Sequence, residues 1–287
     1  MSLYPTLSHR NEEPEKGVLY IVGTPIGNLN DISNRALNIL KNVTLIACED
    51  TRQTMKLMSR FSISNKLISF NQHNSYKKIS SIIDKLKVGY SVALVSDAGM
   101  PSICDPGEDL IINAKLKNID VICIPGPCAA ITALVASGMP SSNFCFEGFL
   151  PKKKVEREEI LYKISRNEQT TILYESPHRI TKLLKELKDF CGGEREIHVS
   201  RELTKKFEEH ICNSIDELLS YFENIEVLGE ITVVIKGRKK LEIEKFNKSI
   251  LKKELCDLIE AGLSLSAASR YLAKKNKLTK SLIYGLY

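Results

Sequence analysis

The sequence predicts an α/β fold of two αβ domains with a helical C-terminal extension. Short, nearly continuous apolar strands alternate with amphipathic helices over residues 17–145, a pattern typical of a parallel sheet covered on both faces. A second αβ alternation covers residues 146–237. Residues 238–287 form a basic, wholly helical pattern. Residues 1–16 are polar, and we expect a loose N-terminal tail there.

The first domain is expected to contain five strands and five helices. The apolar runs place strands at 18–23, 45–48, 67–70, 92–96 and 121–124, with helices at 32–40, 51–60, 78–86, 109–117 and 129–136.

The boundary between the two domains is expected near residues 143–151. This stretch is aromatic and breaks into a charged run at 152–159. Beyond it, we predict a helix ending at 166, strands at 170–174, 197–200, 208–213 and 231–235, helices at 180–190 and 215–222, and extension helices at 249–261, 264–275 and 280–286.

The composition is that of an ordinary globular protein. Hydrophobic residues make up 43% and charged residues 26%, and no apolar run approaches the length of a membrane span. No secretion signal is evident, so we expect a cytoplasmic protein without a membrane partner. The eight cysteines contain no Cys-x-x-Cys pair and several lie in apolar strands, so we expect buried filler and no metal site.

Positive charge is concentrated at the C-terminal end. The chain has a net charge of +6, but the segment from Lys236 onward carries thirteen Lys or Arg and five Asp or Glu. This imbalance indicates a polyanionic partner, with nucleic acid the leading candidate. A solvated, lysine-rich helical tail explains the charge equally well, and the helix pair around Gly262 fits either a small nucleic-acid-binding unit or a packing hairpin.

Three predicted strands end in Gly/Pro turns, at residues 23–29, 96–101 and 125–127. Open α/β sheets bind ligands at the carboxyl ends of their strands, so the three turns indicate one shared cleft. The first turn has neither the Gly-Lys-Ser/Thr of a phosphate-binding loop nor the Gly-x-Gly-x-x-Gly of a dinucleotide site.

The charges expected around this cleft are negative. Glu49, Asp50 and Asp97 fall at strand ends, and Asp105 lies just beyond. An acidic cleft repels a triphosphate but suits S-adenosylmethionine, which carries a sulfonium and an ammonium group and no phosphate. Backbone groups freed by the cleft glycines would hold its two ends; these are Gly23, Gly27, Gly99 and Gly126.

Eight segments of the chain resemble, in order, the sequence motifs of one family: 22–32, 49–54, 96–101, 105–107, 125–130, 146–151, 174–179 and 201–205. The chain thus closely resembles the bacterial small-subunit rRNA cytidine 2'-O-methyltransferases of the tetrapyrrole-methylase fold. The resemblance runs from about residue 18 to 237, and the helical tail also looks like the family's C-terminal extension.

This resemblance implies S-adenosylmethionine bound between the two αβ domains, with no metal. It implies 2'-O-methylation of one decoding-centre cytidine, cytidine-1402, of 16S rRNA in the small ribosomal subunit, by a homodimer. Two departures put hydroxyl contacts in doubt, because the family usually has Thr at Met100 and Ser at Cys128.

Candidate donor-binding residues come from the three turns and, through the resemblance, from the second domain. Asp97 is expected to bind the methionine ammonium, although an Asx turn is the plain alternative. The full set is Gly23, Thr24, Pro25, Gly27, Asn28, Leu29, Ser96, Asp97, Ala98, Gly99, Met100, Asp105, Pro125, Gly126, Ala129, Ala130, Tyr174, Glu230, Ile231 and Thr232.

The reaction requires a base, because a ribose 2'-hydroxyl loses its proton as it attacks the methyl group. Asp50 and Glu49 are the best-placed carboxylates, although Asp50 would equally suit capping of the helix that begins near Thr51. Arg52 is a third candidate catalytic residue, able to pair with these carboxylates or with an RNA phosphate.

Candidate RNA contacts lie in the second domain. Arg179 and Arg201 rank above His178 because a guanidinium suits phosphate. Lys152 and Lys153 stand at the domain boundary, where a solvated linker is the alternative.

Two other functions remain open from the sequence. A tetrapyrrole C-methyltransferase would share the fold, although the segments at 49–52 and 174–179 and the basic tail speak against it. A non-catalytic ribosome-binding protein would keep the fold alone, but it would not need intact glycine turns with Asp50 and Asp97.

Overall fold

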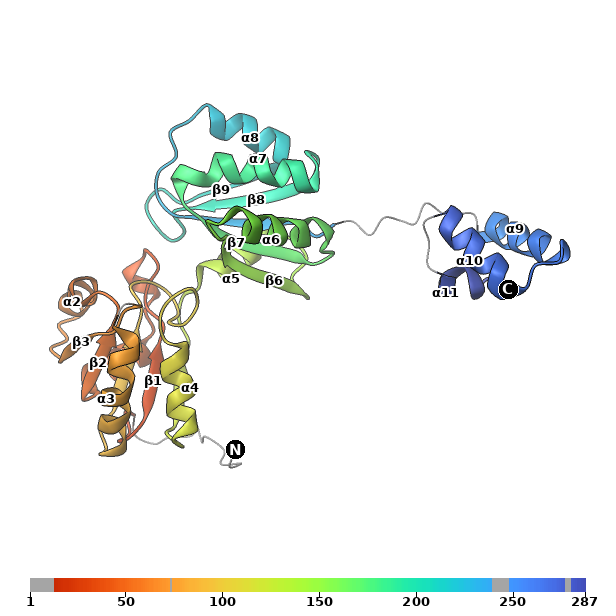
Figure 1. Cartoon of the computed structure of the whole chain (residues 1–287). Coiled ribbons are helices and arrows are strands. Elements are labelled where there is room, and N and C mark those ends of the chain that lie inside the picture. Colours follow the sequence, from red (N-terminus) through yellow and green to blue (C-terminus); the bar gives the residue numbers. More distant parts are fainter. Residues whose placement is uncertain (1–12, 73, 239–247, 277–279) are drawn as a thin grey trace. The chain divides into compact units, whose positions relative to one another are not determined.

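The computed structural model describes residues 13–72, 74–238, 248–276 and 280–287. It divides into two compact units, Met1–Gly237 and Arg238–Tyr287 (Figure 1). We call the first unit the body. Most of the expected loose tail, residues 1–12, lies outside the described residues. Its last part is bound to the body, since Glu13 pairs with Arg35 at 2.6 Å and the amide of Glu15 donates to the Tyr20 hydroxyl.

The first sheet has five parallel strands, which confirms the parallel sheet predicted from the apolar runs. The strand order is β3-β2-β4-β1-β5. Because β1 lies between β4 and β5, the ends of these three strands are side by side. The strands are β1 (Leu19–Val22), β2 (Leu45–Cys48), β3 (Leu67–Ser69), β4 (Val92–Val95) and β5 (Val121–Ile124).

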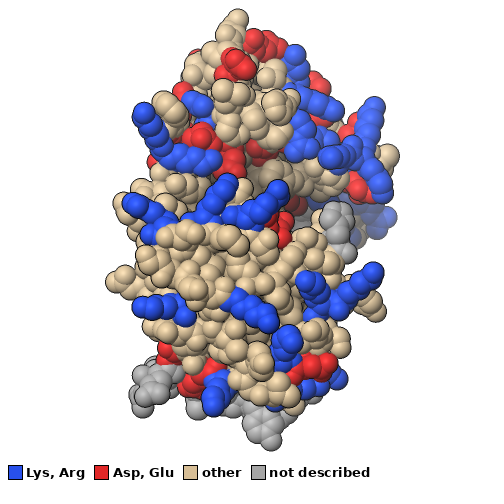
Figure 2. Space-filling view, turned by 90° about the vertical axis from the view of Figure 1, so that its left-hand side faces the viewer, with Lys and Arg blue, Asp and Glu red and all other residues tan. Residues whose placement is uncertain are grey.

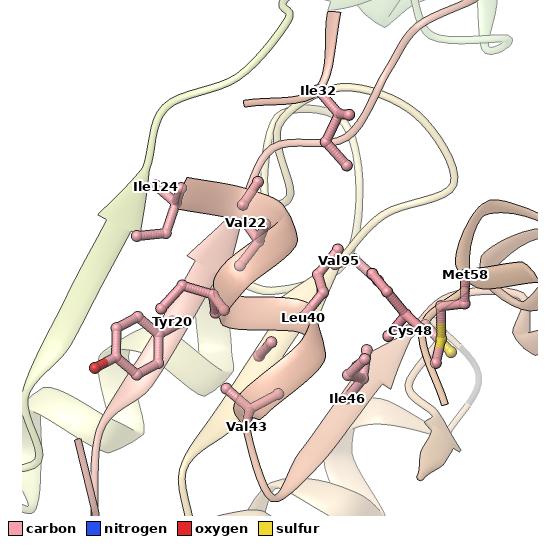
Figure 3. Close-up of a cluster of buried hydrophobic side chains, with 14 of the residues drawn as sticks. Tyr20, Val22, Ile32, Leu40, Val43, Ile46, Cys48, Met58, Val95 and Ile124 are labelled. Carbon is pink, nitrogen blue, oxygen red and sulfur yellow. The ribbon is translucent and has the colours of Figure 1, made fainter. Parts of the chain in front are cut away.

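Helices cover both faces of this sheet. On one face, Tyr20 and Val22 of β1 pack with Leu40 and Met58 in a cluster shown in Figure 3. The alternate residues of β1 pack on the other face against helices α3 and α4. The helices of this part of the chain are η1 (Leu29–Asp31), α1 (Asn34–Asn42), α2 (Thr51–Arg60), α3 (Ser75–Lys87), α4 (Glu108–Leu116) and α5 (Ala129–Ser137). Of these, α5 packs on the second sheet.

The second sheet is mixed, in the order β6-β7-β10-β8-β9. Only the pair β6–β7 is parallel. Helices α6, α7 and α8 pack on one face of it. The elements are β6 (Phe144–Phe149), α6 (Lys154–Arg166), β7 (Thr170–Glu175), η2 (Pro177–Arg179), α7 (Ile180–Cys191), β8 (Glu196–Arg201), β9 (Glu209–Ser214), α8 (Ile215–Glu223) and β10 (Ile231–Ile235).

Strand β6 was not predicted as a strand, and its irregularity explains why. The pairing of β6 with β7 shifts between Phe146 and Gly148, where Gly148 has a φ of +63°. A bulge of this kind breaks the alternation of side chains that marks a strand in a sequence. The expected domain boundary at residue 146 therefore falls inside β6.

Helix α5 links the two sheets. It follows β5 of the first sheet, yet Ala130, Ala133 and Leu134 pack against the face of the second sheet that α6, α7 and α8 leave free, where Ile172 and Val234 lie. The body is thus held together by a helix that extends one domain onto the sheet of the other.

The C-terminal unit, which we define as Arg238–Tyr287, has a core of its own. It contains α9 (Lys248–Glu260), α10 (Leu265–Lys275) and α11 (Lys280–Tyr284). Leu251, Leu255, Leu272 and Ile283 are buried among these helices. Within the described part of the whole chain, no helix has the length and apolar character needed to cross a membrane.

Two glycines fix the spacing between the ends of β1 and β5. A Cβ at Gly126 would lie 2.8 Å from the Cα of Gly23. Because the obstructing atoms are backbone, we expect Gly126→Ala to lower the free energy of unfolding by about 3 kcal/mol. Gly138→Ala, where nothing lies within 4 Å and φ is +64°, should cost about 1 kcal/mol. Denaturant unfolding measures both, and equal losses would contradict the packing argument.

Candidate active site

The three strand-end loops meet at the carboxyl edge of the first sheet, as predicted. The amide of Thr24 donates to the carbonyl of Gly99 at 2.9 Å, and the amide of Gly99 donates back to Thr24 at 3.1 Å. These two hydrogen bonds form an isolated antiparallel bridge between the first two loops. The third loop is adjacent through the Gly23–Gly126 contact.

The first loop contacts the second domain. The amide of Asn28 donates to the Thr204 hydroxyl at 3.0 Å, and a Cβ at Gly27 would lie 2.4 Å from Cγ of Lys205. Of residues 23–29, only Ile26 lines the cavity described next. The six predicted donor-binding residues of this loop therefore stand outside the cavity lining: Gly23, Thr24, Pro25, Gly27, Asn28 and Leu29.

A cavity of about 440 Å³ lies between this edge and the second domain, a size typical of small-molecule sites. Its described lining includes five carboxylates and no Lys or Arg. The predicted donor-binding residues that line it are Asp97, Ala98, Gly99, Met100, Asp105, Ala129, Tyr174, Glu230, Ile231 and Thr232, whereas Ser96, Pro125, Gly126 and Ala130 stand outside the lining.

Glu49 is the predicted catalytic carboxylate that faces the cavity. Glu49 directly follows Cys48, the last residue of β2, so the carboxyl end of this strand positions it. Burial raises the pKa of its carboxyl group, and the charges of Asp105 and Asp97 raise it further. The backbone amide of Asp97 donates to it and partly opposes this shift. Glu49 is thus held as a carboxylate with increased proton affinity.

Asp50 caps helix α2, which is the alternative that the sequence left open. Its Oδ1 accepts from the amide of Arg52 at 2.8 Å, and Arg52 forms an ion pair with it at 2.6 Å. The Arg52 side chain lowers the pKa of Asp50 to about 2. Asp50 is not among the lining residues, but its amide donates to the Asp97 carboxylate at 3.0 Å.

Asp105 and Ser96 form a second polar pair at the cavity. Burial raises the pKa of Asp105, and a hydrogen bond from Ser96 counteracts the increase. Ser96 is buried at the end of β4, so it supports Asp105 from below the lining. Asp97 and Asp105 thus add two further acidic groups beside Glu49.

The opposite wall of the cavity is aromatic. Tyr174 packs against Phe146 and Phe149 with ring centroids 5.0 and 5.5 Å away. Its hydroxyl accepts from the amide of Ala130 at 3.1 Å, and burial raises the pKa of Tyr174. The exposed Phe149 ring lines the cavity. Several other lining residues had no predicted site role: Ile26, Ile103, Cys104, Phe149, Glu175, Ser176, Pro177 and Gly229.

Glu175 is a buried carboxylate in the cavity wall, held by two arginines. Arg179 lies 2.7 Å from it and Arg157 lies 3.6 Å from it. Arg157 is itself buried and forms a shorter pair with Glu186 at 2.7 Å. Arg179, a predicted RNA contact, is therefore occupied in part by this wall, although its buried Nε has no partner in the described part of the chain.

The other predicted RNA contacts differ in how free they are. Arg201 pairs with Glu209 at 2.8 Å, whereas His178, Lys152 and Lys153 are exposed, with Lys153 3.0 Å from Glu156. Figure 2 shows one face of the molecule, on which Lys and Arg side chains lie beside a hollow. No described group of three His, Cys, Asp or Glu side chains is arranged to hold a metal ion.

The fold and this cavity define a two-domain methylase. Residues 18–219 match the family model of the tetrapyrrole (corrin/porphyrin) methylases, and the chain belongs to that family. A solved uroporphyrin-III C-methyl transferase from Thermus thermophilus, in complex with S-adenyl homocysteine, superposes with a TM-score of 0.54 at 15% identity. It covers 76% of this chain and 96% of its own, and shows the shared fold.

Curated relatives place the chain more narrowly within the family. A Synechocystis protein named ribosomal RNA small subunit methyltransferase I is 43% identical over 94% of this chain and 97% of its own length. A Thermotoga maritima protein of the same name is 45% identical over 223 residues, which are 78% of this chain and 100% of that relative.

The buried charges around Glu175 make the cavity wall sensitive to mutation. Arg157→Ala leaves Glu175 and Glu186 without their shared partner, and we expect it to lower the free energy of unfolding by about 3–5 kcal/mol. Lys154→Ala removes an exposed cation 3.8 Å from Glu158 and should cost less than about 1 kcal/mol. Denaturant unfolding compares the two, and a similar small loss for both would mean that the buried pair contributes little.

Proposed function

We propose that this chain transfers the methyl group of S-adenosylmethionine to the 2'-oxygen of a decoding-centre cytidine, cytidine-1402 of 16S rRNA in the small ribosomal subunit. The names of the curated relatives support an rRNA substrate. The observation that carries the proposal is the cavity at the strand ends, with its five carboxylates and no Lys or Arg among the described lining residues.

The cavity residues fit the methyl donor. Carboxylates stabilise its cationic sulfonium and ammonium groups, and Asp97 and Asp105 are the proposed partners of the ammonium. The aromatic wall of Tyr174 and Phe149 suits the flat adenine. When bound, the donor supplies an electrophilic methyl group. The backbone of Ala98 and Met100 offers polar groups for the rest of it.

Glu49 is the proposed general base. As the new bond between the ribose oxygen and the methyl carbon forms and the bond to sulfur breaks, the 2'-hydroxyl proton passes to the Glu49 carboxylate. Glu49 suits this step because it lines the cavity and has a raised pKa. Asp50 is a weaker base, with its pKa of about 2 and its pairing to Arg52. Asp50 instead positions Asp97 through its amide.

The RNA is proposed to approach along basic side chains outside the cavity. Lys152, Lys153 and His178 are exposed and open to phosphate contacts. Arg52, with 86% of its side chain exposed, has donors left beyond those facing Asp50. Arg179 and Arg201 have carboxylate partners, and we propose that they contribute through their remaining N–H groups.

We also propose a cytoplasmic homodimer without a metal. The exposed apolar side chains Ile131 and Val135 of α5 give a surface that a second copy would cover. A tetrapyrrole substrate is the alternative on this fold, and the names of the curated relatives favour rRNA over it.

Replacement of Glu49 tests the assignment of the base. We expect Glu49→Gln to lower the rate of methyl transfer at least about 100-fold while donor affinity stays within a few-fold. Asp50→Asn is the matched control, with a loss below about tenfold. A base acts when deprotonated, so the rate should rise with pH through the raised pKa of Glu49, and Glu49→Gln should lose this dependence. Equal losses for both variants would count against Glu49 as the base.

The substrate is tested with labelled donor and unmethylated small subunits. We expect label in 16S rRNA at one cytidine, where it blocks alkaline cleavage of the adjacent bond. Calorimetry with the donor alone should show binding. Label on a porphyrinogen and not on rRNA would favour the tetrapyrrole alternative, and no donor binding would favour a non-catalytic ribosome-binding protein.

A further inference from the structure

The C-terminal unit lies outside everything that the methylase fold explains. The family model ends at residue 219. The Thermotoga relative, aligned over its whole length, leaves about a fifth of this chain unmatched, which is close to the share of the N-terminal segment and the C-terminal unit combined. That relative bears the same name, so the unit adds something other than the shared chemistry.

Helix α10 presents one face to the core and a different one to solvent. Ala268, Leu272 and Ala273 are buried, which leaves Arg270, Tyr271 and Lys274 exposed. Residues three and four apart share one side of a helix, so these three exposed side chains are neighbours. We call them the α10 basic face.

The cations of this face are free of ion pairs to other described residues, unlike those nearby. Lys275 pairs with Glu254 at 3.1 Å, and Lys280 donates to the Ser266 hydroxyl. Neither Arg270 nor Lys274 has such a partner in the described part of the chain. Two unneutralised cations on one helical face attract a polyanion.

Tyr271 adds an aromatic surface next to Lys274, which is three residues away on the same side of the helix. Its side chain is 56% exposed, although the core of the unit lies directly behind the helix. An exposed ring beside cations is the combination by which proteins bind single-stranded nucleic acid, with bases stacked on the ring and phosphates near the cations. RNA fits this face better than an acidic protein, which would use the cations but not the ring.

We propose that the α10 basic face binds rRNA and raises the affinity of the enzyme for its substrate without taking part in methyl transfer. This inference rests on the proposed rRNA substrate. It assigns the C-terminal unit to docking, and the cavity of the body to donor binding and chemistry.

Substitutions in the full chain test this assignment, with a small-subunit rRNA fragment as the probe in fluorescence anisotropy. Arg270→Ala combined with Lys274→Ala should weaken binding about tenfold and reduce the salt slope of the affinity by about 1–2. Lys115→Ala combined with Lys117→Ala removes the same charge from exposed positions at the end of α4 and should leave affinity unchanged.

The ring is tested separately. Tyr271→Ala should weaken RNA binding about tenfold, whereas Tyr271→Phe keeps the stacking surface and should bind as the unmodified protein does. With small subunits as substrate, the double and Tyr271→Ala variants should raise KM with little change in kcat and in donor affinity. Thermal unfolding confirms that these exposed substitutions leave the fold intact.

The outcomes separate this inference from the proposed function. If the unmodified protein methylates rRNA and the α10 variants bind it equally well, the docking role is overturned. If the variants lose kcat and donor affinity instead, the face acts on the catalytic body and the inference is also wrong. If the unmodified protein binds donor but neither binds nor methylates rRNA, the proposed function itself fails.

Discussion

The close approach of backbone to backbone at the end of β1 is the constraint on which the active site depends. Gly23 lies against Gly126 of the β5 loop, and Thr24 exchanges hydrogen bonds with Gly99 of the β4 loop. Gly27, four residues after Gly23, lies close to Lys205 of the second domain, where a Cβ would collide with the lysine side chain. A side chain at Gly126 would push the β1 and β5 loops apart, because the obstructing atoms of Gly23 are backbone and cannot rotate away. The cavity exists in its present form because one loop holds two other loops and a second domain.

The electrostatics of the site follow from that placement. Parallel strands deliver the residues after β2 and β4 to the same edge, so Glu49 and Asp97 gather there with Asp105. Burial disfavours ionisation of Glu49 and Asp105, the neighbouring carboxylate charges disfavour it further, and the pKa values of both groups are raised. A bound cation removes that penalty. The repulsion within this carboxylate cluster therefore favours binding of a cationic methyl donor.

The strands of the first sheet were predictable because their apolar runs are short and continuous, as in β2 and β5, whose bounds agree with the prediction. The contact of the first loop with the second domain was not predictable, because nothing in a glycine turn shows that it packs against Lys205. The capping of α2 by Asp50 was predictable because it depends only on neighbouring residues. The burial that distinguishes Glu49 from Asp50 was not predictable, because it depends on residues distant in the sequence. Bulged β6 lacked the alternation needed to recognise it.

Division of labour between the body and the C-terminal unit accounts for where the charge lies. A cavity that attracts a cation must be acidic, but an enzyme acting on RNA must attract a polyanion, and one surface cannot do both well. Residues 238–287 carry twelve Lys or Arg against five Asp or Glu, whereas the remainder of the chain is close to neutral. Under the proposed docking role, placing the cations in a unit with its own core lets the chain hold RNA without weakening the acidic cavity.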